Sequence, residues 1–216
     1  MDEARERMLE IYNLSGCSEK PLSWFEELYS SSSRDRKLIP WDWMEPHPFL
    51  VEWVEENNHN GRALVVGSGL GEDAVFLHDK GWEVTAFDVS ESAIEWARQL
   101  HNGIKIDWSV GDLLQPDESW FGSFDLVLEV HILQAIPEEI RNRAYKNLAP
   151  LLARGGFLVC IGRLEEGPEE EEDVPPWPLS RDFVRKIGTG LSEVEIHSAI
   201  IPDKEAIRYR AVWKND

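Results

Sequence analysis

Apolar and polar positions alternate in two different rhythms along most of this chain. Short continuous apolar runs are typical of buried strands, and they predict strands over residues 63–67, 83–88, 104–109, 124–130, 156–162, 192–200 and 206–213. Apolar residues that recur every three or four positions predict helices over residues 72–79, 91–101, 137–153 and 180–187. Strands that alternate with helices indicate an α/β fold, in which a mostly parallel sheet carries helices on both faces. A short connection around Pro202 and Asp203 makes the last two strands antiparallel to each other.

The segment before the first strand has a different pattern. Residues 3–13 and 21–30 predict short helices with one apolar face, and residues 49–56 predict an amphipathic helix. Residues 40–48 contain three prolines, which rules out a regular element there. Loops of this kind rise over the carboxyl edge of a sheet, so we expect this segment to lie near a binding site.

No internal repeat and no shift in composition marks a domain boundary. We therefore expect a single domain over residues 1–216, in which residues 1–48 form an N-terminal helical and lid segment and residues 49–216 form the core. The acidic run over residues 165–173 predicts a solvated loop, and the Pro-Pro-Trp-Pro-Leu-Ser stretch that ends at Ser180 predicts a second stiff loop before the last helix.

The charge of the chain limits its partners. The formal net charge is −19, from 41 acidic and 22 basic residues, so the molecule repels nucleic acids and anionic membranes and small metabolites are the natural substrates. General solubility is the simpler explanation of this charge. No secretory signal is visible in residues 1–7 and no apolar stretch approaches the length of a membrane helix, which predicts a cytoplasmic protein. Cys17 and Cys160 are expected to stay reduced, with Cys160 as a buried structural thiol.

A glycine-rich turn follows the first predicted strand of the alternating region. It contains Gly67, Ser68, Gly69 and Gly71, and glycines let the backbone turn sharply and approach a ligand closely. The dinucleotide fingerprint G-x-G-x-x-G needs a third glycine where this chain has Glu72, and a carboxylate at a helix N-terminus competes with a pyrophosphate. An adenosine cofactor without phosphate and with a positive centre tolerates that carboxylate. S-adenosylmethionine has both properties, and no metal site is predicted.

Two acidic residues follow the next strands. Asp88 ends the second strand of this region, where a carboxylate can accept hydrogen bonds from both ribose hydroxyls; the alternative is a helix cap before Ser90. Asp112 follows the third strand, where it could accept a hydrogen bond from the adenine amino group, with Val89 and Leu113 on the two faces of the ring. The alternative for Asp112 is an ordinary turn residue.

The fourth strand and the tryptophan loops supply candidates for the reacting end. Glu129 could hold the methionine part of the cofactor, and His131 could orient a substrate or take its proton, although a lone histidine often only packs. Trp41, Trp43 and Trp177 lie in proline-bounded loops, where an aromatic face could attract a sulfonium. The alternative is that these tryptophans only anchor their loops on the core.

Together these motifs resemble a class I S-adenosylmethionine-dependent methyltransferase over about residues 40–213. The motifs that carry the resemblance are Val65 to Gly71, Phe87 to Ser90, Gly111 to Leu113, and Phe124 to Glu129. Shorter motifs resemble the thiopurine and thiol methyltransferase-like group: Pro40-Trp41-Asp42, Leu133 to Pro137, and the Pro-Pro-Trp-Pro-Leu-Ser loop. The resemblance implies a Rossmann-like seven-stranded sheet whose last strand is antiparallel. Nucleic-acid and protein amide methyltransferases carry an Asn/Asp-Pro-Pro-aromatic motif that this chain lacks.

The sequence therefore predicts a methyltransferase that acts on a small molecule, with a thiol as one possible acceptor. A thiolate needs no strong general base, which agrees with the lack of a clear acid–base pair. One alternative is an O- or N-methyltransferase of a metabolite, with His131 or Glu129 as the base. Another is a non-catalytic protein that binds S-adenosylmethionine as a sensor. Glu72 disfavours an NAD-dependent oxidoreductase. The sequence does not indicate an oligomeric state.

Overall fold

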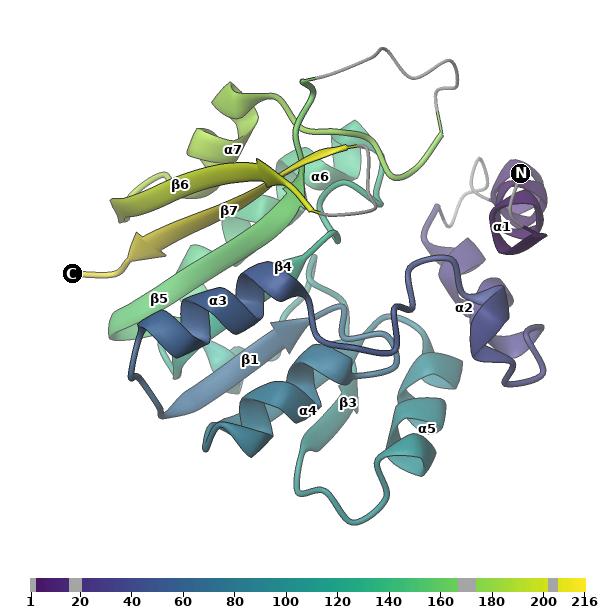
Figure 1. Cartoon of the computed structure of the whole chain (residues 1–216), viewed down its shortest axis with the longest axis horizontal. Coiled ribbons are helices and arrows are strands. Elements are labelled where there is room, and N and C mark those ends of the chain that lie inside the picture. The colour runs from purple at the N-terminus through teal and green to yellow at the C-terminus, as the bar shows by residue number, and fades with distance from the viewer. Residues whose placement is uncertain (1–2, 16–20, 167–173, 202–205) are drawn as a thin grey trace.

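The computed structural model describes residues 3–15, 21–166, 174–201 and 206–216. Its centre is one seven-stranded sheet with the strand order β3-β2-β1-β4-β5-β7-β6 (Figure 1). The strands are β1 (Arg62–Val66), β2 (Glu83–Asp88), β3 (Asp107–Val110), β4 (Phe124–Val130), β5 (Leu152–Arg163), β6 (Ser192–Ile200) and β7 (Ile207–Lys214). Only β7 runs antiparallel to its neighbours, β5 and β6, within the described sheet. The predicted fold class is confirmed.

Helices cover both faces of this sheet. They are α1 (Glu3–Ser15), α2 (Ser23–Ser30), α3 (Pro48–Glu56), α4 (Glu72–Asp79), α5 (Glu91–Leu100), α6 (Glu138–Ala144) and α7 (Arg181–Ile187). Apolar residues of α3, α4 and α5 pack on one face, and those of α6 and α7 pack on the other. This arrangement agrees with the apolar runs predicted as strands, because strands buried on both faces are apolar along their whole length.

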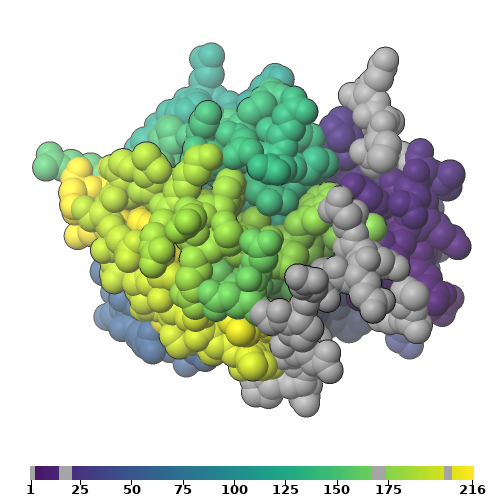
Figure 2. All heavy atoms as spheres, turned by 90° about the horizontal axis from the view of Figure 1, so that it is seen from above, coloured from purple at the N-terminus to yellow at the C-terminus, as the bar shows by residue number. Residues whose placement is uncertain are grey.

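The N-terminal helices lie at one end of the molecule. Trp24, Leu28 and Tyr29 of α2 join Met8 of α1 in a separate apolar cluster that also includes Leu70 of the glycine turn. Figure 2 shows these helices, in purple, grouped at one end beside the rest of the domain. This cluster attaches the N-terminal segment to the turn that follows β1, so α1 and α2 are placed close to the predicted cofactor site.

The helix expected over residues 137–153 is shorter than predicted. α6 ends at Ala144 and is followed by two 3-10 turns, Tyr145–Asn147 and Ala149–Leu151, before β5 begins at Leu152. The physical reason is Pro150, which has no N–H to continue an α-helix and stands in the first turn of the second 3-10 segment. The 3-10 turns let the chain reverse into β5 four residues earlier than the apolar run predicts.

Other predicted features agree with the structure or fall outside it. The Ser90 side chain caps α5 by accepting a hydrogen bond from the amide of Ala93 at 3.0 Å, and Cys160 is buried. β3 begins at Asp107 rather than at residue 104. Cys17, residues 167–173 of the acidic loop and the connection at Pro202 and Asp203 lie outside the described residues. None of the described helices is both long and apolar enough to cross a bilayer.

Candidate active site

A cavity of about 290 Å³ opens at the carboxyl ends of β1, β2 and β4. Its wall includes Val66 at the end of β1, Asp88 at the end of β2 and Val130 at the end of β4. In the sheet, β1 lies between β2 and β4, so the chain crosses from one side of β1 to the other at this point. Open α/β sheets bind their ligands at such switch points. The remaining wall comes from α1, α2, the glycine turn and the proline-rich segment over residues 39–47.

The glycine turn has the backbone geometry that its sequence predicts. Gly67, Gly69 and Gly71 all have positive φ, at 61°, 52° and 95°. A Cβ atom at Gly67 would lie 2.3 Å from the Cδ1 of Ile132, so no other residue fits there without movement. The hydroxyl of Ser68, on the cavity wall, is buried and has no hydrogen-bond partner among the described residues. The turn therefore offers close backbone approach and one unsatisfied hydroxyl to a ligand.

Asp88 holds the turn from the end of β2. Its side chain is 7% exposed, and its two oxygens accept hydrogen bonds from the amides of Gly69 and Ser90, each at 2.9 Å. Burial raises the pKa of this carboxyl, and the backbone hydrogen bonds oppose that rise. Each carboxylate oxygen can accept a second hydrogen bond. Asp88 thus shapes the loop before Ser90 and still has acceptor capacity on the cavity wall.

The residues predicted to hold adenine lie next to Asp88 but outside the cavity wall. The amide of Gly111 donates to the carbonyl of Asp88 at 2.9 Å, which joins the turn after β3 to the end of β2. Asp112 uses one oxygen to accept from the amide of Leu114 at 2.8 Å. Leu113 is buried in the main core, and Val89 is exposed. The adenine role of Val89, Asp112 and Leu113 stays a prediction.

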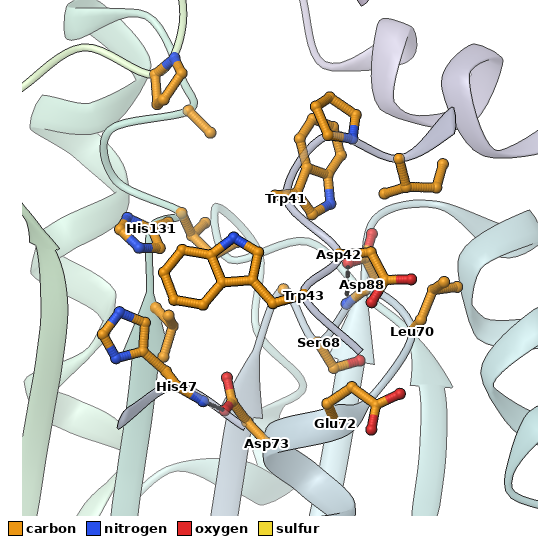
Figure 3. Close-up of a pocket in the computed structure, with 18 of the residues that line it drawn as sticks. Trp41, Asp42, Trp43, His47, Ser68, Leu70, Glu72, Asp73, Asp88 and His131 are labelled. Atoms are coloured by element: carbon orange, nitrogen blue, oxygen red, sulfur yellow. Dashed lines mark hydrogen bonds between the residues drawn. The ribbon is translucent and has the colours of Figure 1, made fainter. Parts of the chain in front are cut away.

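An ionic cluster joins the proline-rich segment to the start of α4. Arg36 makes two hydrogen bonds to the carboxylate of Asp42, at 2.6 and 2.7 Å, and a third bond to Glu72. The Trp41 indole N–H donates to the hydroxyl of Tyr29 at 2.9 Å. These contacts place Trp41 beside the glycine turn, on the same side of the cavity as Asp88 (Figure 3).

The opposite side of the cavity is lined by aromatic and imidazole rings. Trp43 stacks on His47 with 5.2 Å between ring centroids, and the His131 ring lies 5.5 Å from His47 and 6.5 Å from Trp43. Figure 3 shows both imidazoles on one side of Trp43 and Asp88 on the other. The guanidinium of Arg208, from β7, lies 5.5 Å above the Trp43 ring.

Hydrogen bonds determine which nitrogen of His131 carries the proton. The side-chain oxygen of Gln134 accepts from the amide of Arg163 at 2.6 Å, and this fixes the orientation of the side-chain amide. The same oxygen lies 3.1 Å from Nδ1 of His131, so Nδ1 must donate and Nε2 keeps its lone pair. Burial lowers the pKa of His131 to about 4, and the ring is therefore neutral at neutral pH.

His47 has the opposite tautomer. Its Nδ1 accepts from the amide of Phe49 at 3.2 Å, so the proton sits on Nε2. Burial lowers the pKa of His47 to about 2, with further lowering by His131 and Arg208. The side chain is 4% exposed, and Nε2 has no hydrogen-bond partner within the described parts of the chain. The cavity wall thus contains one imidazole donor and one imidazole acceptor.

Comparison with known proteins shows which proteins this chain is similar to. A family model described as a methyltransferase domain matches residues 63–156. The chain is 27% identical over 151 residues to a probable thiol methyltransferase 2 of Arabidopsis thaliana, covering 68% of this chain and 66% of that protein. It is 26% identical over 187 residues to thiocyanate methyltransferase 1 of the same plant, covering 83% and 81%. The solved N-methyltransferase NodS of Bradyrhizobium japonicum, in complex with S-adenosylhomocysteine, has the same fold, with a TM-score of 0.64, 19% identity and 99% coverage of both chains.

The chain contains a methyltransferase domain, and its relatives and its fold support an S-adenosylmethionine-dependent methyltransferase. The cavity of this methyltransferase fits its cofactor on structural grounds, because the glycine cradle has no room for a Cβ at Gly67 and the Ser68 hydroxyl lacks a partner. Asp88 can hold the ribose hydroxyls with its remaining lone pairs, and Gly67 to Gly71 can approach the ligand with their backbone. Trp41 can offer its ring face to a sulfonium.

Two predicted site residues of the methyltransferase lie elsewhere. Glu129 is 1% exposed and is not on the cavity wall, and its oxygen accepts from the amides of Ile132 and Leu133 at 2.7 and 2.9 Å. It stabilises the turn that presents His131, while its second oxygen is buried without a partner among the described residues. Its contact with the methionine part stays a prediction. Trp177 contacts Tyr12 and Arg141 outside the cavity wall. The preceding Pro175 and Pro176 do line the cavity, and the substrate role of Trp177 stays a prediction.

Sequence reasoning missed several wall residues of the methyltransferase. Asp73 accepts from the amide of His47 at 2.8 Å, and burial raises its pKa to about 6. The position of His47 between two prolines, in a segment expected near the site, could have identified it. No local signal marks Arg208, because it reaches the cavity only through the antiparallel pairing of β7 with β5.

Proposed function

We propose that this methyltransferase transfers the methyl group of S-adenosylmethionine to the sulfur of a small thiol. The observation that carries the proposal is the state of four of the five acidic residues on the cavity wall; the fifth, Glu45, is exposed. Asp42 and Glu72 pair with Arg36, Asp73 holds the His47 amide, and Asp88 holds the glycine turn. With these carboxylates engaged, the site suits a nucleophile that ionises without a strong base, and thiols have pKa values of about 8.5.

The chain's own residues contribute positioning and exclusion of water. When bound, the cofactor supplies an activated methyl carbon that an incoming sulfur takes in an in-line displacement. Asp88 and the glycine turn fix the cofactor end of the cavity. Trp41 and Trp43 line the cavity wall. The Nε2 lone pair of His131 can accept a hydrogen bond from the thiol. Such positioning in a dry pocket accounts for much of the acceleration of a bimolecular reaction.

The relatives support a sulfur acceptor, because their names describe thiol and thiocyanate methylation. A second candidate is methylation of a hydroxyl or amine of a metabolite, and the neutral His131 with its free Nε2 lone pair favours it. We also infer that the protein acts in the cytoplasm, on a small molecule rather than a nucleic acid, which agrees with its net charge of −19.

The test is turnover of methyl-labelled S-adenosylmethionine with a panel of aliphatic thiols, thiocyanate, phenols and amines. Labelled product from sulfur acceptors supports the proposal, and product from phenols or amines alone replaces it with the second candidate. Calorimetry with S-adenosylhomocysteine runs in parallel. Tight cofactor binding without any turnover would assign the chain as a sensor. A surface variant such as Arg185→Gln, prepared in the same way, is the control for loss of activity during purification.

A further inference from the structure

Two arginines on one strand have opposite surroundings. Arg210 of β7 is 4% exposed and binds the carboxylates of Glu52, Glu56 and Glu195 at 3.5, 3.2 and 2.9 Å. Arg208, two residues earlier on β7, is 7% exposed, and no carboxylate within the described ranges pairs with it. Removing a charge from water is costly unless an opposite charge or several hydrogen bonds replace the water. Arg210 satisfies this condition within the chain and Arg208 does not.

The hydrogen bonds of Arg208 are also incomplete. One terminal nitrogen donates to the carbonyl of Ala206 at 3.2 Å, while Nε is buried without a partner among the described residues. Arg208 lines the cavity, and it lies in register with Arg163 of β5, which lines the cavity as well. Two positive side chains from adjacent strands therefore reach one end of the cavity, and burial together with Arg163 lowers the pKa of Arg208.

His47 adds a neutral donor to the same end. Its Nε2–H is buried and lacks a partner in the described structure. The His47 ring stacks on Trp43, and the Arg208 guanidinium also lies over the Trp43 ring. Two unsatisfied donors, the Nε of Arg208 and the Nε2 of His47, thus lie on the wall of one cavity. Buried donors without acceptors are rare in folded proteins and mark the place of a missing partner. An acceptor with negative charge in this cavity suits such donors.

We propose that Trp43, His47, His131 and Arg208 form an anion subsite, which binds the negative charge of the methyl acceptor. This inference rests on the proposed function, since it takes this end of the cavity as the acceptor's place. The ligand class is a small sulfur nucleophile that carries a negative charge, either on the sulfur itself or on a carboxylate beside a thiol. The rings of Trp43 and His131 both line this end of the cavity, with 6.5 Å between their centroids.

The subsite also explains how a thiol could react without a strong base. A neighbouring arginine stabilises the thiolate and so increases its fraction at neutral pH. The proton leaves to solvent, because the pKa of His131, lowered to about 4 by burial, makes its Nε2 a weak base. The bond from acceptor sulfur to methyl carbon forms as the bond from methyl carbon to sulfonium breaks, and its electron pair stays on the cofactor's sulfur. The negative charge of the acceptor sulfur and the positive charge of the sulfonium are both lost. Each sulfur atom is then neutral, as a thioether in the product and in the demethylated cofactor.

Calorimetric titration of the protein saturated with S-adenosylhomocysteine tests the subsite without turnover. The probes are thiocyanate, 3-mercaptopropionate and the neutral 3-mercaptopropanamide. We expect the wild type to bind at least one anion more tightly than the neutral amide. Arg208→Gln should weaken anion binding by about tenfold or more, since hydrogen bonds to charged groups are strong. Arg208→Lys keeps the charge and should retain part of the affinity.

Two further variants separate local charge from other effects. Arg185→Gln makes the same change in net charge on the exposed surface of α7, and it should bind every probe as the wild type does. His47→Asn keeps an oxygen that can accept from the Phe49 amide but shortens the donor, and a loss of a few-fold in anion affinity is expected. Unchanged S-adenosylhomocysteine binding and circular dichroism confirm that each variant is folded.

The outcomes distinguish this inference from the proposed function. If Arg208→Gln and His47→Asn both bind the anions as the wild type does, the subsite is wrong. Equal affinity of the wild type for the anions and the neutral amide also overturns it, and methylation of neutral thiols would then leave the proposed function intact. Anion binding that depends on Arg208 but yields no methyl transfer would support the subsite and overturn the proposed function. Binding of thiocyanate locates the charge on sulfur, whereas binding of 3-mercaptopropionate alone locates it on the carboxylate.

Discussion

The two ends of the cavity are built in different ways. The cofactor end uses the turn from Gly67 to Gly71 and Asp88, which belong to one strand–helix–strand unit. The acceptor end combines Trp43 and His47 from the proline-rich segment with His131 after β4 and Arg208 on β7. Backbone geometry defines the first end and side-chain chemistry defines the second. The difference explains how a common fold can keep one cofactor while its acceptor changes.

The two ends also differ in charge. At the cofactor end lie Asp88 and the carboxylates of Asp42 and Glu72, which pair with Arg36. At the acceptor end lie Arg163, Arg208 and two neutral imidazoles, together with Asp73, which accepts from the His47 amide. A positive methyl donor and a negative acceptor would each lie against the side of opposite sign. The two ends therefore differ in the charged groups that line them, and the following experiments test each end separately.

The largest effect is expected from removal of Asp88. Asp88→Ala leaves the amides of Gly69 and Ser90 without their acceptor and removes the ribose ligand. Losing hydrogen bonds to a charged group costs about 1.5–3 kcal/mol, so cofactor affinity should fall by roughly ten- to hundredfold. Calorimetry with S-adenosylhomocysteine measures this change. A folded variant with the wild-type dissociation constant would show that the cofactor end does not depend on Asp88.

Asp117→Ala is the matched control for that experiment. Asp117 also accepts from a backbone amide two residues along the chain, that of Ser119 at 2.8 Å, but it is exposed and outside the cavity wall. Its removal should leave cofactor affinity unchanged. An equal loss in both variants would mean that the Asp88 effect reflects general loosening rather than the ribose contact.

The next effect is an opposite dependence of stability on pH at the two ends. The folded pKa of His131 is about 4, below the ordinary histidine value. Between these two values the unfolded chain binds a proton that the folded chain does not, so the free energy of unfolding rises with pH. The contribution is complete above about pH 6.5 and is lost as pH falls towards about 4, by about 3 kcal/mol.

Asp88 acts in the other direction. Burial raises its folded pKa, so the folded chain keeps a proton that the unfolded chain has lost, and the free energy of unfolding falls as pH rises through that window. Urea denaturation between about pH 4 and about pH 8 tests both signs. His131→Asn should reduce the decrease in the free energy of unfolding as pH falls. Asp88→Asn should reduce the decrease in the free energy of unfolding as pH rises. The same pH dependence in wild type and His131→Asn would show that His131 is not buried as a neutral ring.

Sequence patterns revealed the cofactor end because its determinants are local. Positive φ at Gly67 and Gly69 follows from glycines placed between a strand and a helix, and the Ser90 cap follows from a serine before an amphipathic run. The helix over residues 137–153 was wrong for an equally local reason, since Pro150 interrupts it and the apolar spacing alone does not reveal where a helix gives way to 3-10 turns.

The acceptor end could be predicted only in part, because it depends on register and side-chain direction. His131 and Trp43 were found, but Arg208 reaches the cavity through its pairing with Arg163 across β5 and β7. The burial of Glu129 behind the cavity wall could not be predicted, because a strand buried on both faces has no polar alternation to show which residue faces the cavity. The comparison between the two ends is thus also one between local and long-range determinants.

A smaller effect distinguishes the two tryptophans of the proline-rich segment. Trp41 bonds to Tyr29 at the cofactor end, and Trp43 lies against His47 and Arg208 at the acceptor end. Trp41→Phe should weaken S-adenosylhomocysteine binding by about three- to tenfold and leave the acceptor KM unchanged. Trp43→Phe should raise the acceptor KM by a similar factor and leave cofactor affinity unchanged. If either variant changes both quantities equally, the segment acts as one lid and the two ends are not independent.

The smallest effect is expected at Asp112, beside the cofactor end but outside the cavity wall. One of its oxygens holds the Leu114 amide, and the other is free to accept from the adenine amino group. In Asp112→Asn the side-chain oxygen can still accept from the Leu114 amide, which preserves the turn. The new NH2 group replaces the second acceptor oxygen and would face the amino group of adenine, which is also a donor. Affinity for S-adenosylhomocysteine should fall by less than about tenfold. The matched ligand S-inosylhomocysteine has a carbonyl in place of that amino group, and the variant should therefore bind it better than the wild type does. If Asp112→Asn binds both ligands as the wild type does, Asp112 is a turn residue, and cofactor recognition at this end depends on Asp88 and the glycine turn.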